Sequence, residues 1–316
     1  MIDFFDSLYS SIKGNNKFLK RIQFYSATRF IIRLVANFIF PIYFKLTKNN
    51  KRYALPTPLK RDRRVIVSLT SFPTRIAKVW LVIETILRQT KKPDIIILWL
   101  SKEQFSSVDF LPSNLLKQRE RGLEIRLEEG DIRSHKKYFY TLLEYPNDYV
   151  LTVDDDIYYK STMIDNLFGY SIRYPVSVIA QYCKEIQRIE DKLKSYALWP
   201  TINKETTPNS YSFFGTGGGT LFPPFSLDSD VLNKDIFMSL APTADDVWLN
   251  VMCRLKGTKI TQTSYHSTYL PILNSHDITL DFYNNNLNQN DVQINTLREY
   301  YIKKRGIDPF AKTLEI

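Results

Sequence analysis

Cysteine is scarce in this sequence, and its scarcity excludes two classes of protein. The chain of 316 residues has two cysteines, Cys183 and Cys253, which are far apart and have no paired spacing. A disulfide-rich scaffold or a thiolate metal site needs more cysteines at closer, regular spacings. Two unpaired cysteines suit a reducing compartment, and we expect the protein to be cytoplasmic.

A long uninterrupted hydrophobic run is also missing. The most apolar stretch, residues 30–44, is interrupted by Arg33 and Pro41 and is shorter than the roughly 20 residues that a membrane-spanning helix needs. The stretch starts late and no small-residue cleavage site follows it, so it does not fit a cleaved signal peptide. No internal repeat is visible either, which indicates a globular chain with an apolar segment near its N-terminus.

Excess positive charge is absent from most of the chain. Residues 1–64 hold 14 Lys and Arg against three acids, a net charge of +11, whereas the other 252 residues hold 29 basic and 30 acidic side chains. A nearly neutral main body does not fit a protein that binds nucleic acid over its whole surface, so we expect no nucleic-acid partner. We divide the chain into a basic arm, 1–63, and a main domain, 64–316, which is long enough to bury a full core.

The basic arm is amphipathic at helical spacing. Arg29, Arg33 and Asn37 share one face, and the opposite face is apolar, with Ile31, Leu34, Val35, Phe38 and Ile42. This pattern is typical of a helix that lies in the interface of an anionic membrane leaflet. The alternative is a helix packed on the core or on another subunit. We expect a protein peripheral to the inner face of the cytoplasmic membrane, with an arm that locates it and does not build its active site.

From residue 64 onward, strand-like and helix-like patterns alternate. We expect strands at 65–69, 94–100, 124–127 and 148–153. Between them we expect helices at 76–89, 111–121 and 135–144. Such an order implies right-handed crossovers and a mainly parallel, doubly wound α/β sheet. Past residue 160 the pattern is looser, with a helix at 161–173, a strand at 177–182 and a helix at 247–255.

The fourth expected strand ends in three consecutive carboxylates, Asp154, Asp155 and Asp156. Like charges in a small volume repel, so the arrangement persists most easily where a cation neutralises it. Hard oxygen ligands suit Mg²⁺ or Mn²⁺. The carboxyl end of a strand is also where open α/β sheets bind ligands. A solvated loop or a helix N-cap is the alternative; we favour a metal site.

Six segments in a fixed order carry a resemblance to a known fold. They are residues 67–76, 98–101, 136–137, 153–156, 215–219 and 244–249. Together they resemble GT-A type glycosyltransferases and are similar to the bacterial family-two-like glycosyltransferases of capsule and lipopolysaccharide synthesis. The resemblance covers roughly residues 64–300 and omits the arm. It implies a GT-A type, Rossmann-like fold with a nucleotide-binding half, 64–157, and an acceptor-binding half, 158–316.

The resemblance also implies an activity. It is the transfer of a sugar from a nucleotide-diphosphate sugar to a hydroxyl of a growing surface glycan, by inverting displacement. A divalent metal, Mn²⁺ or Mg²⁺, would neutralise the departing diphosphate as a Lewis acid. The implied metal ligands are Asp156 and Asp154, with His276 preferred over His266 as a C-terminal ligand. The implied donor-binding residues are Thr70, Ser71, Arg75, Lys137, Asp154 and Asp155. An ordinary turn at 70–73 and a solvated Lys136–Lys137 pair remain alternatives.

A base for the acceptor hydroxyl is implied at the second acidic pair, Asp245 and Asp246, and we prefer Asp246. The alternative is a helix N-cap, because Asp suits that position. Gly217, Gly218 and Gly219 lack the spacing of a dinucleotide fingerprint or a P-loop. We interpret them as the lining of the sugar or acceptor pocket, with Trp248 as a stacking platform, against the alternative of a plain tight turn.

Two other classes of protein remain open. A sugar-nucleotide nucleotidyltransferase would carry a glycine-rich loop after its first strand, and residues 70–75 contain no glycine. A non-enzymatic, membrane-tethered metal-binding module has no need of the second acidic pair. We therefore expect an enzyme whose partners are a nucleotide-diphosphate sugar, a glycan or lipid-linked glycan acceptor, and an anionic membrane surface.

Overall fold

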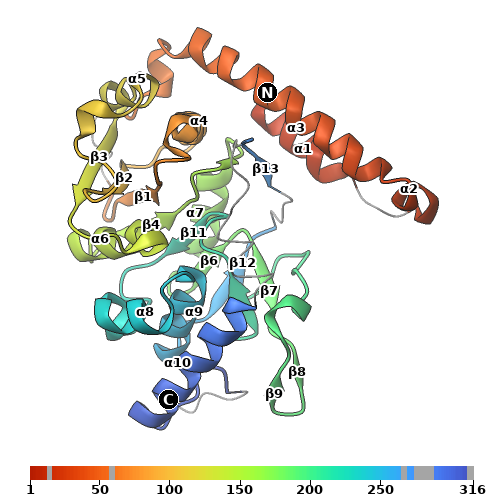
Figure 1. Cartoon of the computed structure of the whole chain (residues 1–316), viewed down its shortest axis with the longest axis vertical. Coiled ribbons are helices and arrows are strands. Elements are labelled where there is room, and N and C mark those ends of the chain that lie inside the picture. The colour runs from red at the N-terminus through yellow and green to blue at the C-terminus, as the bar shows by residue number, and fades with distance from the viewer. Residues whose placement is uncertain (13–15, 57–60, 265–268, 274–287, 312–316) are drawn as a thin grey trace.

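A seven-stranded sheet forms the centre of the molecule, in the strand order β12-β6-β11-β4-β1-β2-β3 (Figure 1). The computed structural model describes residues 1–12, 16–56, 61–264, 269–273 and 288–311. The strands are β1 (Val65–Thr70), β2 (Ile95–Ser101), β3 (Leu123–Glu128), β4 (Tyr149–Thr152), β6 (Val178–Ala180), β11 (Thr220–Phe222) and β12 (Ile260–Gln262). Each neighbouring pair is parallel except those of β11, which runs antiparallel to β4 and β6. The predicted α/β fold with a mainly parallel sheet is confirmed.

Helices cover both faces of the sheet, which explains why successive residues of its central strands are buried. Alternate residues of one strand enter two different cores, as Leu151 packs with one cluster and Val150 with the other. The first core includes side chains of α4 (Ile76–Leu87) and α7 (Met163–Arg173). The second includes side chains of α6 (Lys136–Glu144), α8 (Lys234–Leu240), α9 (Asp245–Leu255) and α10 (Gln289–Arg305).

One predicted helix, 111–121, is wrong over most of its length. The chain forms the short helix α5 (Ser113–Leu116) and then a 3₁₀ turn at Arg119–Arg121. Between them the buried Gln118 amide turns inward and donates to the Trp80 carbonyl at 2.7 Å. This tertiary contact overrides the local helical pattern.

Short strand pairs complete the second half of the main domain. β5 (Ile157–Tyr158), directly after the acidic triplet, pairs with β13 (Leu270–Pro271). β7 (Cys183–Glu185) pairs with β10 (Ser212–Phe214), and β8 (Arg188–Ile189) with β9 (Lys192–Leu193).

The basic arm folds into α1 (Ile2–Ser11), α2 (Lys17–Arg21) and α3 (Phe24–Thr47), and α3 contains the predicted amphipathic helix. Its 24 residues are long and apolar enough to cross a membrane by length and composition alone, so our expectation that the segment is too short does not hold. One side of α3 is nevertheless packed on the main domain, where Phe40 and Phe44 are fully buried in the first core.

A hydrogen-bonded side chain also joins α3 to the main domain. The Asn37 amide donates to the Pro271 carbonyl at 3.1 Å. Its oxygen accepts from the Leu273 amide at 2.9 Å and from the Tyr158 hydroxyl at 3.2 Å. The arm therefore holds the β5–β13 pair that follows the acidic triplet.

Candidate active site

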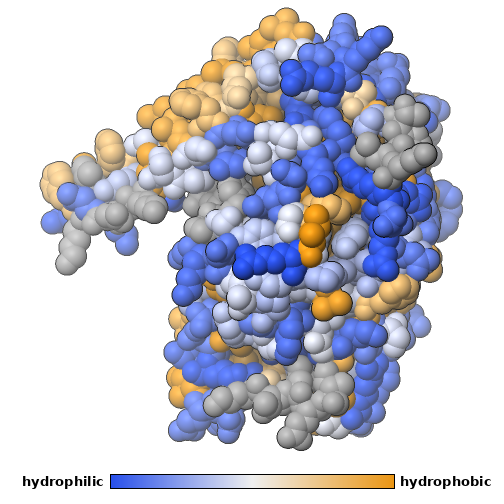
Figure 2. Space-filling view, turned by 180° about the vertical axis from the view of Figure 1, so that it is seen from behind, coloured by the Kyte–Doolittle hydropathy of each residue, from blue (hydrophilic) through white to orange (hydrophobic). Residues whose placement is uncertain are grey.

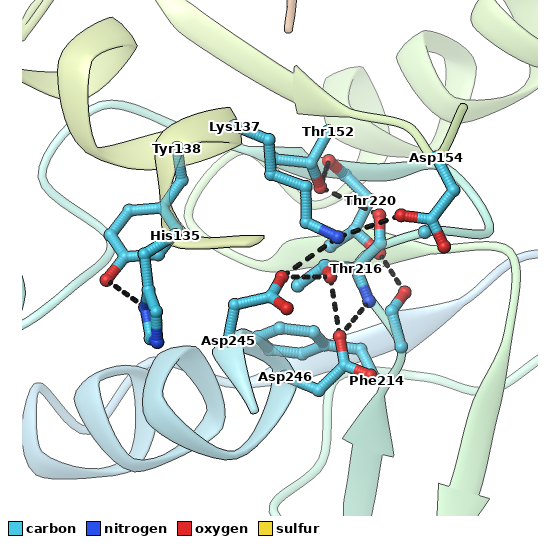
Figure 3. Close-up of polar contacts among 12 residues, drawn as sticks. His135, Lys137, Tyr138, Thr152, Asp154, Phe214, Thr216, Thr220, Asp245 and Asp246 are labelled. Carbon is cyan, nitrogen blue, oxygen red and sulfur yellow. Dashed lines mark hydrogen bonds and ion pairs between the residues drawn. The ribbon is translucent and has the colours of Figure 1, made fainter. Parts of the chain in front are cut away.

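Several chain segments meet at one edge of the sheet, and they bring the two acidic motifs together (Figure 3). Asp154 follows β4, and the glycine-rich segment 215–219 precedes β11, which is antiparallel to β4. α6 carries Lys137, and α9 begins at Asp245. These elements lie 17 to more than 100 residues apart in the sequence, so the site is created by the fold.

Lys137 bridges the two acidic motifs. Its ammonium lies 2.9 Å from Asp154 Oδ1 and 2.9 Å from Asp245 Oδ2 (Figure 3). Burial opposes the charge on Lys137, but the carboxylates of Asp154 and Asp245 prevail and raise its pKa. Lys136 is also buried and pairs with Asp131. The alternative of a solvated lysine pair is therefore wrong, whereas the contact of Lys137 with a diphosphate stays a prediction.

Thr216 holds the second acidic pair, and our sequence interpretation missed it. Its backbone amide donates to Asp246 Oδ1 at 2.7 Å. Its hydroxyl lies 2.6 Å from Asp245 Oδ2 and 2.5 Å from Asp246 Oδ1, so it orients both carboxylates (Figure 3). The position of Thr216 between Gly215 and Gly217 was the available signal, but nothing in the local pattern connects it with α9.

The pKa values of the two carboxyl groups in this pair shift in opposite directions. Burial, together with the charge of Asp245, raises the pKa of Asp246 to about 6. Burial also opposes ionisation of Asp245, but the nearby Lys137 ammonium prevails and lowers the pKa of that carboxyl. Pairs of acids whose surroundings separate their pKa values are typical of sites with distinct acid and base roles. Asp246 is the member suited to accept a proton near neutral pH.

The middle carboxylate of the triplet points into the protein. Asp155 is buried and accepts from the Ser71 hydroxyl at 2.5 Å and from Arg75 at 2.8 Å. Ser71 is buried too, and the donor contacts predicted for Ser71 and Asp155 stay predictions. Thr70 donates its hydroxyl to the Trp99 carbonyl at 2.8 Å. The donor-binding roles of Thr70 and Arg75 stay predictions.

Asp154 and Asp156 are the carboxylates of the triplet that reach solvent, with side chains 42% and 27% exposed. Burial and the neighbouring Asp154 raise the pKa of Asp156 to about 7, although Arg75 lies 2.8 Å away. This surplus of negative charge and the hard oxygen donors fit a divalent cation. Within the described residues no group of three His, Cys, Asp or Glu could hold a metal alone. Two carboxylates that share a cation with substrate phosphates and water match the binding mode of Mg²⁺.

The histidines add no metal ligand to this description. His276, the predicted C-terminal ligand, and His266 lie outside the described residues. His135 is fully buried, with Nδ1 2.8 Å from the Tyr138 hydroxyl and Nε2 2.8 Å from the Ala241 carbonyl. A carbonyl only accepts, so Nε2 carries the proton. Burial lowers the pKa of His135 to about 4, which keeps the ring neutral.

Two of the three consecutive glycines lie so close to neighbouring side chains that any Cβ atom would displace them. A Cβ atom on Gly217 would lie 1.7 Å from Asp154 Oδ2, and one on Gly218 would lie 1.7 Å from the Tyr269 hydroxyl. The Tyr159 hydroxyl binds the Gly217 carbonyl and accepts from the Asp154 amide. The glycine-rich segment therefore lies against the Asp154 carboxylate, as a pocket lining would. Its contact with a sugar stays a prediction.

Trp248 is not a stacking platform. Its side chain is 0% exposed, its ring nitrogen donates to the Val231 carbonyl at 3.2 Å, and its ring lies against Phe237. It lies in the first turns of α9, but on the side that enters the second core. The residue spacing alone could not show which side of this buried helix faces the site.

Comparisons with known proteins give distant structural likenesses only. No family model matches the chain, and no curated protein matches it in sequence. One similar structure is the mannosyltransferase PcManGT from Pyrobaculum calidifontis, solved with GDP-Man and Mn²⁺. The two sequences are 16% identical, the alignment covers 89% of this chain and 77% of PcManGT, and the TM-score is 0.47. Another is TarS 1-349 from S. aureus, solved with UDP. The sequences are 11% identical, the alignment covers 77% of this chain and 74% of the TarS chain, and the TM-score is 0.44.

A third solved structure belongs to another class. It is 4-diphosphocytidyl-2C-methyl-D-erythritol synthase, with 12% identity, coverage of 57% of this chain and 86% of its own, and a TM-score of 0.34. Likenesses this distant do not define an activity. The function has to be argued from the site.

Proposed function

We propose that this protein is a metal-dependent glycosyltransferase. It moves a sugar from a nucleotide-diphosphate sugar to a hydroxyl of a glycan or lipid-linked glycan acceptor, in the synthesis of a capsule or lipopolysaccharide. One observation carries the proposal: Lys137 contacts both Asp154 and Asp245, at 2.9 Å each. A partly exposed acidic site for a cation therefore lies beside an acidic pair in which the pKa of one member, Asp246, is raised. Leaving-group departure and proton removal need two such sites at one reaction centre.

The roles of the residues follow from their surroundings. Asp154 and Asp156 would hold Mn²⁺ or Mg²⁺, which supplies Lewis-acid stabilisation of the departing diphosphate. Asp246 accepts the proton of the acceptor hydroxyl as the oxygen attacks the anomeric carbon. The bond from that carbon to the diphosphate breaks, and its electron pair leaves with the nucleoside diphosphate. Asp245, kept ionised by Lys137, orients Thr216 against Asp246. Attack opposite the leaving group inverts the anomeric centre.

Product analysis tests the class of reaction. The full-length protein with Mn²⁺ is mixed with a panel of nucleotide-diphosphate sugars, with and without candidate glycan acceptors. We expect release of a nucleoside diphosphate that increases when an acceptor is added. A nucleotidyltransferase would instead release pyrophosphate from a nucleoside triphosphate and a sugar phosphate. Pyrophosphate release, or turnover that excess EDTA leaves unchanged, would contradict the proposal.

We also propose that the outer face of α3 binds the anionic inner surface of the cytoplasmic membrane. The outer face, defined as Ile31, Leu34, Val35, Phe38 and Ile42, is exposed, and Phe38 reaches 72%. Apolar side chains gather along the arm in Figure 2. The net charge of +11 over residues 1–64 complements anionic lipid. Because the opposite side is packed on the main domain, the helix would lie in the membrane interface and not cross it.

Vesicle binding tests the membrane proposal. The full-length chain should sediment with vesicles that contain anionic lipid and much less with neutral vesicles, and salt should weaken the binding. The double variant Leu34→Ser/Phe38→Ser should lose binding. Phe110→Ser/Val176→Ser, which alters two exposed apolar side chains of the main domain, should keep it. Equal binding by the two variants would contradict the assignment to α3.

A further inference from the structure

A polar cavity lies beside the glycine-rich segment, between the start of α7 and the ends of β6 and β12. It has a volume of about 340 Å³ and is lined by Lys160, Thr162, Asp165, Asn166, Gln181 and Ser264. All six side chains are polar. A ligand with several hydroxyl groups would find donors and acceptors among these side chains.

Two lining side chains carry buried polar atoms that lack a hydrogen-bond partner among the described residues. Gln181 is 1% exposed, and its Nε2 is unpartnered. Asn166 Oδ1 is unpartnered as well. A buried amide without a partner costs free energy, so a molecule in the cavity that reaches these atoms would relieve that cost. They offer one donor and one acceptor, which a pair of hydroxyl groups can satisfy.

The charges around the cavity disfavour an anionic ligand. The Lys160 ammonium pairs with Asp6 of α1 at 3.2 Å, and the cavity also carries the carboxylate of Asp165. A phosphate or diphosphate would therefore meet one lysine that is already paired and one like charge. A neutral ligand with hydroxyl groups needs no free cation and is not repelled by the Asp165 carboxylate.

The cavity lies at the same edge of the sheet as the acidic motifs. β6 and β12 run parallel to each other, and β11 is antiparallel to both β6 and β4. The carboxyl ends of β4, β6 and β12 therefore lie at one edge. β11 separates β6 from β4, and strand spacings of about 4.8 Å place the end of β6 about 10 Å from that of β4.

One loop contacts both places. Gly217 lies against Asp154, and two residues later the Gly219 carbonyl accepts from the Gln181 backbone amide at 3.1 Å. A Cβ atom on Gly219 would approach the Gln181 side chain to 3.4 Å. A ligand in the cavity would therefore lie across this loop from the reaction centre.

We propose that this cavity is a subsite for a neutral sugar residue of the acceptor, at a distance from the residue that reacts. The inference rests on the proposed function for its place in the reaction, but sugar binding by the cavity can be measured without any transfer. Gln181 and Asn166 would bind hydroxyl groups of that residue. A glycan acceptor longer than one residue would thus contact the enzyme at two points along the sheet edge.

Ligand-observed saturation-transfer NMR tests the subsite in the full-length protein, with no donor and no metal. The probes are neutral hexoses, N-acetylhexosamines and their disaccharides. We expect signal from at least one probe, with an affinity at least tenfold weaker in Gln181→Leu and weakened in Asn166→Ala. Asn203→Ala, on the wall of a separate cavity, is the matched control and should bind as the parent does. Melting curves establish that each variant is folded.

The outcomes separate this inference from the proposed function. Absence of signal from every probe, or equal affinity in the parent and the two cavity variants, overturns the subsite. A soaked crystal with water alone on Gln181 Nε2 also overturns it. Acceptor-dependent release of nucleoside diphosphate without sugar binding in the cavity would leave the transferase assignment intact. Sugar binding that the variants abolish, without any transfer, would support the cavity as a sugar site and count against the transferase.

Discussion

The two acidic motifs occupy the same sheet edge, yet their carboxylates differ in what surrounds them. In the triplet, Arg75 contacts Asp155 and Asp156, and two carboxylates of the three still reach solvent. In the pair, Thr216 and Lys137 bind the acids directly, and Asp245 is buried. The triplet therefore keeps oxygen atoms of Asp154 and Asp156 available to an added cation, whereas both carboxylates of the pair are held by Thr216 within the protein. The same residue type can thus supply a metal ligand in one motif and a base in the other.

Neutralising one carboxylate in each motif should produce different kinetic effects. Asp246→Asn keeps the shape of the side chain and removes the base, so turnover should fall by about 10²–10⁴-fold, with little change in donor affinity. Asp156→Asn should instead raise the Mn²⁺ concentration needed for half-maximal rate. Initial rates over a grid of donor and metal concentrations give both quantities. If Asp246→Asn changes only donor affinity, the base assignment is wrong.

Removal of the bridge should destabilise both motifs. Lys137→Met keeps the length of the side chain but leaves the carboxylates of Asp154 and Asp245 without their shared ammonium. Loss of one partner from a buried pair typically costs about 3–5 kcal/mol, so the free energy of unfolding should fall by that order. Urea denaturation measures the loss. Lys102→Met removes an exposed pair with Glu129 and should lower the free energy of unfolding far less, because water and salt screen that pair. Equal losses in the two variants would contradict the bridge.

Thr216 should matter to the pair and not to the triplet. Thr216→Val keeps the shape of the side chain and deletes the hydroxyl that contacts Asp245 and Asp246. The free energy of unfolding should fall by about 1–3 kcal/mol, and turnover should fall as well. Its backbone contact with Asp246 remains, so the loss should be smaller than in Asp246→Asn. Metal titration should be unchanged, and a shift in metal affinity would show that the two motifs are not separable. Thr220→Val is a neighbouring control, because its hydroxyl binds the Gly215 carbonyl.

The pH dependence should report on Asp246. Its pKa of about 6 lies above the ordinary value, so the group is protonated and inactive as a base below pH 6. Turnover should rise as pH increases through about 6 and then level off. The free energy of unfolding should change in the opposite direction and decrease as pH rises, because the folded state binds the Asp246 proton more tightly than the unfolded state does. The contribution of Asp246 to stability therefore falls as pH rises from about 4 through 6, and Asp246→Asn should remove this slope.

The sequence was sufficient where function depends on local pattern. The runs of β1 and β2 predict buried strands, and the acids that follow β4 predict a ligand site at a strand end. It was insufficient where the partner is distant along the chain. Lys137 contacts an aspartate 108 residues later, and Thr216 contacts Asp246 30 residues later. Burial explains the error at Trp248, because no spacing rule shows that its ring turns into the protein while Asp246 faces the site.

The binding of α3 to the main domain has a practical consequence for any soluble form of this protein. The Ile272 amide donates to the Asp156 carbonyl at 2.7 Å, and Asn37 holds the residues on both sides of Ile272. A version cut near Lys60 would lose Asn37 and expose Tyr158, so the arm supports the backbone behind Asp156, whereas our expectation that it does not build the active site stays a prediction. Biochemists who need a detergent-free sample should keep residues 1–63 and make the outer face of α3 polar. Crystals of such a variant would preserve the backbone behind Asp156.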